Sequence, residues 1–486
     1  MVFRKEVNRL INQRVIQDLS KVVGKDNIIK SKIALASYSF DSSPYKGHPG
    51  VVVFPTTTEM VAQIMKIANK YNVPVLPRGA GTSLSGGTIA PPGSIVISLT
   101  KMNKILEVNP QGKYALVEGG ATNKAIQLAA QPYGLMFAPD PGSQNVATIG
   151  GNIAANAGGM RGVKYGSTKD NLLGLEIVLP SGEVITTGGL NSDIEGNIDL
   201  TYLFCGSEGT FGIVTKAWVS LTPIYSDIMT MTATFPSLED AGSCVAEIIA
   251  QGVIPTAMEI MDNIVIVALE EYMQMGLDKT AEALLLIEID GFSSEVQAQG
   301  EKIIKALENN KANNYQIAKN VEDRQELWRG RRSVNGALGK IRPGMLVHDI
   351  VVPRDRLAFM LKKVAEIAKK YNIIIGQVAH AGDGNSHPSL LYDHRNSEEL
   401  ERVEKAGEEI IKEALAQGGV ITGEHGIGIE KIKYMNLAFT PASLLYMAKV
   451  KEAFDPDNLT NPGKKLPPEL QGQGGDKLGE QKLRAN

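Results

Sequence analysis

Between Gly50 and about Thr222, short runs of Val and Ile alternate with glycine and proline, a pattern typical of strands bounded by turns. The runs are VVVFP, VPVLPRG, SIVISL, YALVEGG, LEIVLPSGEVI and GIVTKAWVSL. Between the first two lies TTTEMVAQIMKIANKYN, whose threonines can cap a helix with its apolar residues on one side. This part of the chain therefore predicts a strand–helix–strand unit followed by further strands.

From Tyr225 to about Gly419 glycine is less frequent, and longer helical patterns alternate with strands such as ALLLIEIDG, MLVHDIVVP and IIIGQVAHAG. This alternation of helical and strand patterns indicates a second α+β domain. The following segment, from ITGEHGIGIEK to FDPDNLTNPGKK, is rich in turns, and we expect it to pack back near a functional site. The closing QGQGGDKLGEQKLRAN is polar and glycine-rich, which predicts disorder. The predicted boundaries are 1–223, 224–419, 420–466 and a disordered tail over 467–486.

Composition and charge exclude several classes of protein. A chain of 486 residues is longer than one hydrophobic core usually organises, so we expect two or more domains, or one domain with a large insertion. Its net charge of -3 gives no electrostatic attraction to nucleic acid. It contains no apolar run long enough for a transmembrane segment, and its N-terminus resembles an amphipathic helix more than a signal peptide, so we expect a cytoplasmic protein. The two cysteines lack the spacing of an iron–sulfur cluster or a thiolate zinc site.

Three glycine-rich segments carry the first chemical signal. The segment PRGAGTSLSGG, residues 77–87, follows an apolar strand and leaves backbone N–H groups able to face an anion such as a diphosphate. It matches neither a Walker loop nor a GxGxxG motif that opens a helix. The others are PDPGSQNVATIGGNIAANAGG, residues 139–159, and GSEGTFG, residues 206–212. Three such segments in one domain exceed what turns require, so we expect a bound ligand.

The second signal is a group of histidines in two glycine-flanked motifs, HAGDGNSH at 380–387 and GEHG at 423–426. The Gly-Asp-Gly turn can return His387 to the side of His380, and Glu424 can add an oxygen ligand. Two imidazoles and a carboxylate leave coordination positions open, as a catalytic metal requires. The ligand set admits Zn, Fe or Mn.

A third signal is the segment LWRGRRS, residues 327–333, which we expect to start a helix. Arginines spaced this closely often form only a solvated surface. A guanidinium group, however, can hold a carboxylate through two parallel hydrogen bonds. Arg329, Arg331 and Arg332 are all candidates for this role.

The glycine-rich segments together resemble the FAD-binding domain of the vanillyl-alcohol oxidase superfamily, in its glycolate oxidase and D-lactate dehydrogenase branch. The resemblance covers nearly the whole chain. It implies an α+β protein with a PCMH-type FAD-binding domain of two subdomains over 1–223, a cap domain with an antiparallel sheet over 224–419, and a C-terminal helical segment packing on the FAD domain. FAD should be noncovalent, because Ala80 and Gly81 stand where some relatives attach the flavin through histidine. The implied FAD contacts are Arg78, Gly79, Gly81, Thr82, Ser83, Gly87, Pro141, Gly142, Gly150, Gly151, Asn152, Gly158 and Val214.

The same resemblance assigns roles to the residues of the second half. It makes His380, His387 and Glu424 ligands of a divalent metal at the substrate, and His425 the base that takes the hydroxyl proton. Neutral imidazole is available for this near pH 7. Asn385 is expected to hydrogen-bond the substrate or the flavin. The flanking residues favour Arg331 for the substrate carboxylate, with Arg329 and Arg332 as alternatives.

The resemblance therefore implies an FAD-dependent dehydrogenase of a small 2-hydroxy acid, such as D-lactate or glycolate. Where some relatives carry Lys-Tyr-Asp, this chain has Val347-His348-Asp349, which disfavours the larger diacid D-2-hydroxyglutarate. Since no second redox centre is encoded, we expect an electron-accepting partner such as an electron-transfer flavoprotein or an iron–sulfur subunit. Alternatives are an oxidase that uses oxygen directly and a noncatalytic FAD-binding relay subunit. A zinc hydrolase would leave the glycine-rich loops unexplained.

Overall fold

The computed structural model describes residues 11–189 and 199–471, and the predicted tail lies largely outside this range. The chain forms two compact units, and each unit is made of segments that are not contiguous in the sequence. Unit 1 comprises residues 1–157, 167–223 and 424–486, and unit 2 comprises 158–166 and 224–423. None of the helices in the described part is long and apolar enough to cross a membrane.

Unit 1 is built on two larger sheets, and a short two-stranded sheet pairs β7, Leu135–Met136, with β11, Thr222–Pro223. The first has the order β1-β2-β4-β3, with β2, β4 and β3 parallel, and the second has the antiparallel order β5-β6-β10-β8-β9. Every strand run expected before residue 223 is a strand of one of them. The bounds are β1 Ile28–Ile29, β2 Val51–Val53, β3 Val75–Arg78, β4 Ile95–Ser98, β5 Ile105–Asn109, β6 Tyr114–Glu118, β8 Leu172–Val178, β9 Val184–Gly188 and β10 Ile213–Ser220.

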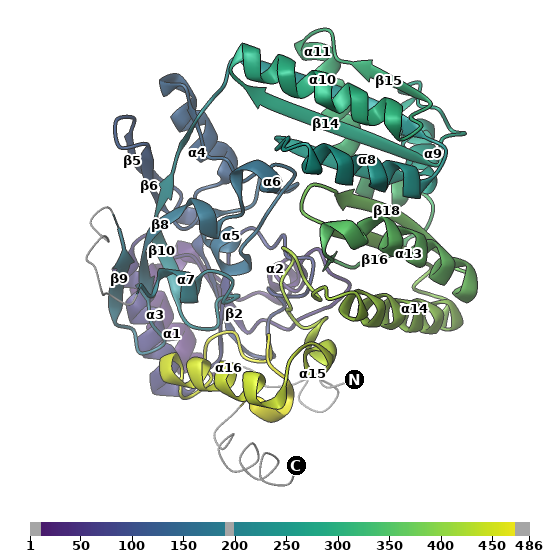
Figure 1. Ribbon diagram of the computed structural model, residues 1–486. Coiled ribbons are helices and arrows are strands. Elements are labelled where there is room, and N and C mark those ends of the chain that lie inside the picture. Colours follow the sequence, from purple (N-terminus) through teal and green to yellow (C-terminus); the bar gives the residue numbers. More distant parts are fainter. Residues whose placement is uncertain (1–10, 190–198, 472–486) are drawn as a thin grey trace. The chain divides into compact units, whose positions relative to one another are not determined.

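The helices of unit 1 cover these sheets. The predicted helix after VVVFP is α3, Thr58–Tyr71, and Thr57 caps it by accepting a hydrogen bond from the Met60 N–H group. It packs beside α1, Gln13–Val23 (Figure 1), and their apolar sides share one core cluster. The end of the chain returns to the first sheet, because Thr460 bridges to Val75. The other α-helices of the described part of unit 1 are α2 Lys32–Ala36, α4 Asn123–Ala130, α5 Ile149–Ala155, α7 Thr201–Phe204, α15 Met435–Ala438 and α16 Pro441–Phe454.

Unit 2 is an antiparallel sheet with the order β15-β12-β14-β13-β18-β19-β16, and β17 also pairs with β19. This confirms the α+β fold with an antiparallel sheet in the second half. The strands are β12 Asp227–Phe235, β13 Ala257–Asp262, β14 Ala283–Gly291, β15 Asn314–Ile317, β16 Gly344–Val347, β17 Ile350–Val351, β18 Ile374–His380 and β19 Asn385–Tyr392. The helices are α6 Gly162–Tyr165, α8 Leu238–Ala250, α9 Asn263–Met273, α10 Ser293–Asn309, α11 Val321–Arg332, α12 Val334–Leu338, α13 Leu357–Tyr371 and α14 Ser397–Ala416.

The two faces of the unit 2 sheet differ in what covers them. Helices α9, α11 and α12 pack on the face that carries Met261, Leu286 and Val378 in one hydrophobic cluster. On the opposite face α10 lies against Met229, where Gly300 allows close approach, and α14 lies against His348. Helices α8 and α13 pack between these two. Because side chains alternate along a strand, the strand register shows which residues lie on the same face as Met261, Leu286 and Val378.

The arginine-rich segment differs from its prediction, since it ends a helix and does not start one. Helix α11 begins after Asn320, whose side chain accepts a hydrogen bond from the Asp323 N–H group. Acidic residues occupy its first turn, and Arg329, Arg331 and Arg332 occupy its last. This distribution complements the helix dipole, and the sequence interpretation overlooked it.

Asp262 at the end of β13 gives a test of stability against pH. It caps α9 by accepting a hydrogen bond from the Val265 N–H group at 3.0 Å, and burial raises its pKa to about 7. The folded state thus binds this proton more tightly than the unfolded chain, so its contribution to stability falls as the pH rises from about 4 to 7. We expect Asp262→Asn, which keeps the cap, to stabilise the protein at pH 8 by up to roughly 4 kcal/mol. Thermal unfolding should show no such gain near pH 4.

Candidate active site

A cavity in unit 1 is lined by the three glycine-rich segments and is the candidate FAD site. The first segment contributes its loop, the second the start of α5, and the third the turn before β10. Their lining residues are Arg78, Gly79, Ser83, Ser85, Gly87, Thr88, Thr148, Gly150, Gly151, Ala154, Ala155, Ser207, Glu208, Gly209, Gly212 and Val214, together with His425. Close backbone approach and small hydroxyl side chains suit a dinucleotide.

Glycine is required in the first loop for reasons that the structure makes explicit. A Cβ atom on Gly79 would lie 2.1 Å from the Thr148 Oγ1 atom. At Gly81, where φ is +77°, a Cβ atom would lie 2.0 Å from the Arg78 guanidinium group. That guanidinium donates hydrogen bonds to the carbonyl oxygens of Phe40 at 2.8 Å and Thr88 at 3.3 Å, and burial lowers its pKa. Gly81 therefore lets the loop close around its own arginine, and Gly79 lets the loop approach the start of α5.

The predicted FAD contacts fall into two groups. Those that line the cavity are Arg78, Gly79, Ser83, Gly87, Gly150, Gly151 and Val214. Those that lie outside its lining are Gly81, Thr82, Pro141, Gly142 and Asn152, while Gly158 belongs to unit 2. Asn152 donates a hydrogen bond to the Asn123 side chain, which joins α5 to α4.

The loop that carries His425 is fixed within unit 1 by a buried carboxylate. The Glu208 carboxylate accepts hydrogen bonds from the N–H groups of Ile427, at 2.7 Å, and Gly428, at 2.8 Å. The Ser85 hydroxyl donates to the His425 carbonyl oxygen at 2.8 Å. Ser85, Glu208 and His425 all line the cavity, so these bonds fix the backbone of the His425 loop at the cavity wall. Sequence reasoning singled out the GSEGTFG segment but missed this role of its glutamate.

In unit 2 the HAGDGNSH motif forms the turn of the β18–β19 hairpin, as predicted. Gly384 has φ +80°, a conformation that favours glycine, and the register pairs His380 with Asn385 and Val378 with His387. The rings of His380 and His387 lie 5.0 Å apart between centroids. His380, Asn385 and His387 therefore project from one face of the sheet, the face that also carries α11.

Arg331 reaches the same face and meets a residue that the sequence interpretation missed. Its Nε and Nη2 atoms each lie 2.7 Å from the Oε2 atom of Glu259, while the His380 Nδ1 atom lies 2.6 Å from Oε1. Burial alone would raise the pKa of Glu259, but Arg331 and His380 hold it below its usual range. By contrast Arg329 pairs with Glu326 at the surface, and Arg332 is exposed.

The residues around the two histidines fit a metal ion. With Nδ1 of His380 bonded to Glu259, Nε2 is the nitrogen that a metal would bind. The Nδ1 atom of His387 lies 3.8 Å from the Asp349 carboxylate, which accepts a hydrogen bond from the Gly423 N–H group at 2.9 Å. Glu424 follows Gly423 directly in the chain, so its backbone starts from this anchored point. Imidazole and carboxylate ligands suit a borderline divalent cation.

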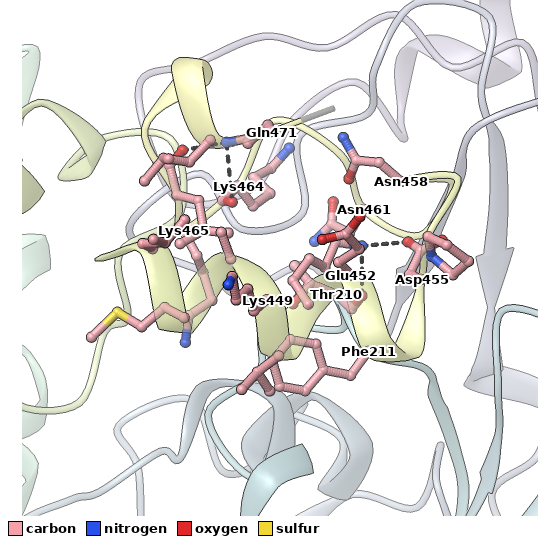
Figure 2. Close-up of a pocket in the computed structure, with 18 of the residues that line it drawn as sticks. Thr210, Phe211, Lys449, Glu452, Asp455, Asn458, Asn461, Lys464, Lys465 and Gln471 are labelled. Atoms are coloured by element: carbon pink, nitrogen blue, oxygen red, sulfur yellow. Dashed lines mark hydrogen bonds and ion pairs between the residues drawn. The ribbon is translucent and has the colours of Figure 1, made fainter. Parts of the chain in front are cut away.

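A larger cavity of about 350 Å³ lies elsewhere in unit 1, between α16 and residues 455–471 (Figure 2). Three of its four lysines, Lys451, Lys464 and Lys465, donate hydrogen bonds to backbone carbonyl oxygens of the protein. The Lys451 ammonium donates to the Thr210 carbonyl oxygen at 2.8 Å and bonds Asp455, and the Lys464 ammonium donates to the Ile89 carbonyl oxygen at 2.9 Å. Much of the remaining lining is apolar, including Phe211, Leu445 and Leu466.

Comparison with known proteins agrees with this geometry. Residues 49–188 match the family described as FAD binding domain, and residues 225–465 match FAD linked oxidases, C-terminal domain. The chain belongs to the FAD-linked oxidases, in the branch that includes glycolate oxidase subunits and D-lactate dehydrogenases. It is an FAD-dependent oxidoreductase.

Two curated relatives and one solved structure illustrate the match. The chain is 41% identical to glycolate oxidase subunit GlcD of Bacillus subtilis, over 94% of this chain and 97% of that protein. It is 35% identical to D-lactate dehydrogenase of Archaeoglobus fulgidus, over 88% and 95%. The fold matches that of p-cresol methylhydroxylase with a TM-score of 0.79 and 20% identity, over 93% of this chain and 97% of that one.

Proposed function

We propose that the protein oxidises a small 2-hydroxy acid, D-lactate or glycolate, to the 2-oxo acid. The observation that carries the proposal is the placement of Arg331, His380 and His387 on one sheet face of unit 2, an arrangement suited to a carboxylate beside a metal-bound hydroxyl. The names of the relatives, a glycolate oxidase subunit and a D-lactate dehydrogenase, support the same choice of substrate.

Each residue has a defined part in the reaction. The Arg331 guanidinium binds the substrate carboxylate, and His425 accepts the proton of the 2-hydroxyl group. Asn385 is buried, and its Oδ1 atom has no hydrogen-bond partner among the described residues, so it can accept a hydrogen bond from the substrate. Bound FAD supplies the hydride acceptor for the hydrogen on C2, and a divalent metal held by His380, His387 and Glu424 would acidify the hydroxyl.

The position of Val347 supports a small monoacid. Val347 pairs with Ser389 in the β16–β19 register, and Ser389 lies two residues after His387 on the same face. An apolar side chain here offers no partner to a second carboxylate.

We therefore expect Val347→Lys to shift specificity toward D-2-hydroxyglutarate. A charge-assisted hydrogen bond to the distal carboxylate should raise the ratio of kcat/KM for this acid over that for D-lactate roughly tenfold to a hundredfold. Steady-state kinetics with both acids measure the ratio, and Val347→Met serves as the uncharged control of similar length. An equal shift in the Met variant would mean that size alone sets the preference.

Electrons from the reduced flavin must leave the protein. We propose that an electron-transfer flavoprotein or an iron–sulfur subunit takes them, since the two cysteines of the sequence are free thiols and too few to ligate an iron–sulfur cluster. Stoichiometric hydrogen peroxide during aerobic turnover would instead favour the oxidase alternative.

The test of the proposed function is anaerobic mixing of the purified FAD-loaded protein with D-lactate, L-lactate, glycolate or D-2-hydroxyglutarate. Absorbance near 450 nm reports flavin reduction, with and without prior treatment by a chelator. We expect bleaching by D-lactate or glycolate that the chelator prevents and added metal restores. A yellow protein that none of the acids bleaches would overturn the proposal and favour the noncatalytic relay alternative.

A further inference from the structure

We propose that Glu259 is a positioning residue that links the arginine of the substrate carboxylate to a histidine of the metal site. The roles of Arg331 and His380 come from the proposed function, and the inference rests on it. Glu259 itself contacts neither substrate nor metal in this scheme. It acts through the two side chains that its carboxylate joins.

Glu259 is buried in the sheet, and both oxygens of its carboxylate are paired. It lies in the middle of β13, between Met258 and Ile260, and its side chain is 0% exposed. Its neighbour in the register is His380 itself, on the adjacent β18. A buried carboxylate is stable only if its oxygens are paired, and here Arg331 occupies one oxygen and His380 the other.

The bond to His380 sets which ring nitrogen can bind a metal. Metal-binding histidines commonly donate their other N–H group to a carboxylate, which fixes both the tautomer and the orientation of the ring. The 2.6 Å contact between Glu259 Oε1 and His380 Nδ1 has this form. Loss of such a partner typically weakens metal binding by 10- to 100-fold.

The bond to Arg331 sets which edge of the guanidinium can bind a ligand. Glu259 engages the edge formed by Nε and Nη2, both 2.7 Å from Oε2. Nη1 is not part of this contact, which leaves it to donate to a substrate carboxylate. The Glu259 carboxylate thus fixes the position of the Arg331 guanidinium, which binds the acid, relative to the His380 imidazole, which binds the metal.

Unit 2 contains a matched control for this role. Glu288, on β14, lies on the same sheet face and is also buried. It accepts hydrogen bonds from Arg324 Nε at 2.8 Å, Arg324 Nη2 at 2.9 Å and Trp328 Nε1 at 2.6 Å. It forms the same type of glutamate–arginine pair, but with Arg324 in place of Arg331 and with Trp328 in place of a histidine.

The experiment compares Glu259→Gln and Glu288→Gln in the full-length FAD-loaded protein. Metal-free samples are titrated with Zn²⁺ or Mn²⁺ against a chromophoric chelator, and KM and kcat for D-lactate are measured after loading. For Glu259→Gln we expect 10- to 100-fold weaker metal binding and a raised KM, with the flavin content unchanged. For Glu288→Gln we expect wild-type metal affinity and KM with a lower melting temperature.

The outcomes separate the inference from the proposed function. Equal metal affinity in the wild type and Glu259→Gln would overturn the link, as would equal losses in the Glu259 and Glu288 variants. A wild-type protein that binds neither ion would overturn the metal site and the link with it. If Glu259→Gln does not fold, Glu259→Asp keeps the buried charge while its shorter side chain reaches only one partner. It should still weaken metal binding or raise KM.

Discussion

Replacing His380 by alanine should lower the rate of substrate oxidation on the order of a thousandfold while the protein keeps its flavin. A metal ion that polarises the reacting hydroxyl contributes several kcal/mol to the barrier, and each 1.36 kcal/mol is tenfold in rate. His380 belongs to unit 2, whereas the candidate FAD cavity is lined by residues of unit 1. The anaerobic rate of flavin reduction measures the effect, and the absorbance spectrum of the resting protein reports the flavin content.

His394→Ala provides the control for this prediction. His394 follows β19 in the same unit but is exposed, and it should leave both the rate and the metal content unchanged. Loss of FAD from the His380 variant would contradict the separation of the two sites. Retention of the wild-type rate would remove His380 from the metal site.

Replacing His425 by glutamine should lower kcat by about 10²- to 10⁴-fold, the usual contribution of a positioned general base. The KM for D-lactate should change little, because the carboxylate is held by Arg331. Glutamine retains a polar side chain of similar length, and Glu208 and Ser85 hold the loop through the backbone, so its conformation should persist. Stopped-flow flavin reduction at saturating substrate measures the effect.

The exposed His48, also in unit 1, gives the matching control as His48→Gln, with no expected change. An unchanged kcat in the His425 variant would mean that another group accepts the proton of the 2-hydroxyl group. A large rise in KM without a change in kcat would make His425 a binding residue.

Much of the fold follows from local sequence pattern. The strand runs and the helix over 58–71 are predictable because alternation, apolar spacing and a capping threonine all agree there. The histidine hairpin is predictable because Gly384 permits the turn that returns His387 toward His380. The direction of α11 is missed when the cluster of arginines is interpreted without the acidic first turn that precedes it.

The pairing of distant residues cannot be derived from the sequence in the same way. Glu259 and Arg331 are 72 positions apart, and only the strand register and the path of α11 bring them together. A weak signal exists, since a glutamate within the apolar strand AMEIM must find a buried partner. Nothing in the sequence identifies that partner. The same holds for Glu208, whose two acceptor bonds go to a loop about 220 residues later.

The short segment 158–166 limits where the chain can be cut into fragments. It leaves unit 1 for unit 2, where the Lys164 ammonium and the Tyr165 hydroxyl both bond the buried Asp290 carboxylate. A fragment of residues 224–423 would therefore lack the cation that neutralises Asp290, and a fragment ending at 223 would lack the loop that Glu208 binds. Each continuous half of the sequence thus lacks contacts that the other supplies, and we expect stable chimaeras of relatives to require the exchange of non-contiguous segments together.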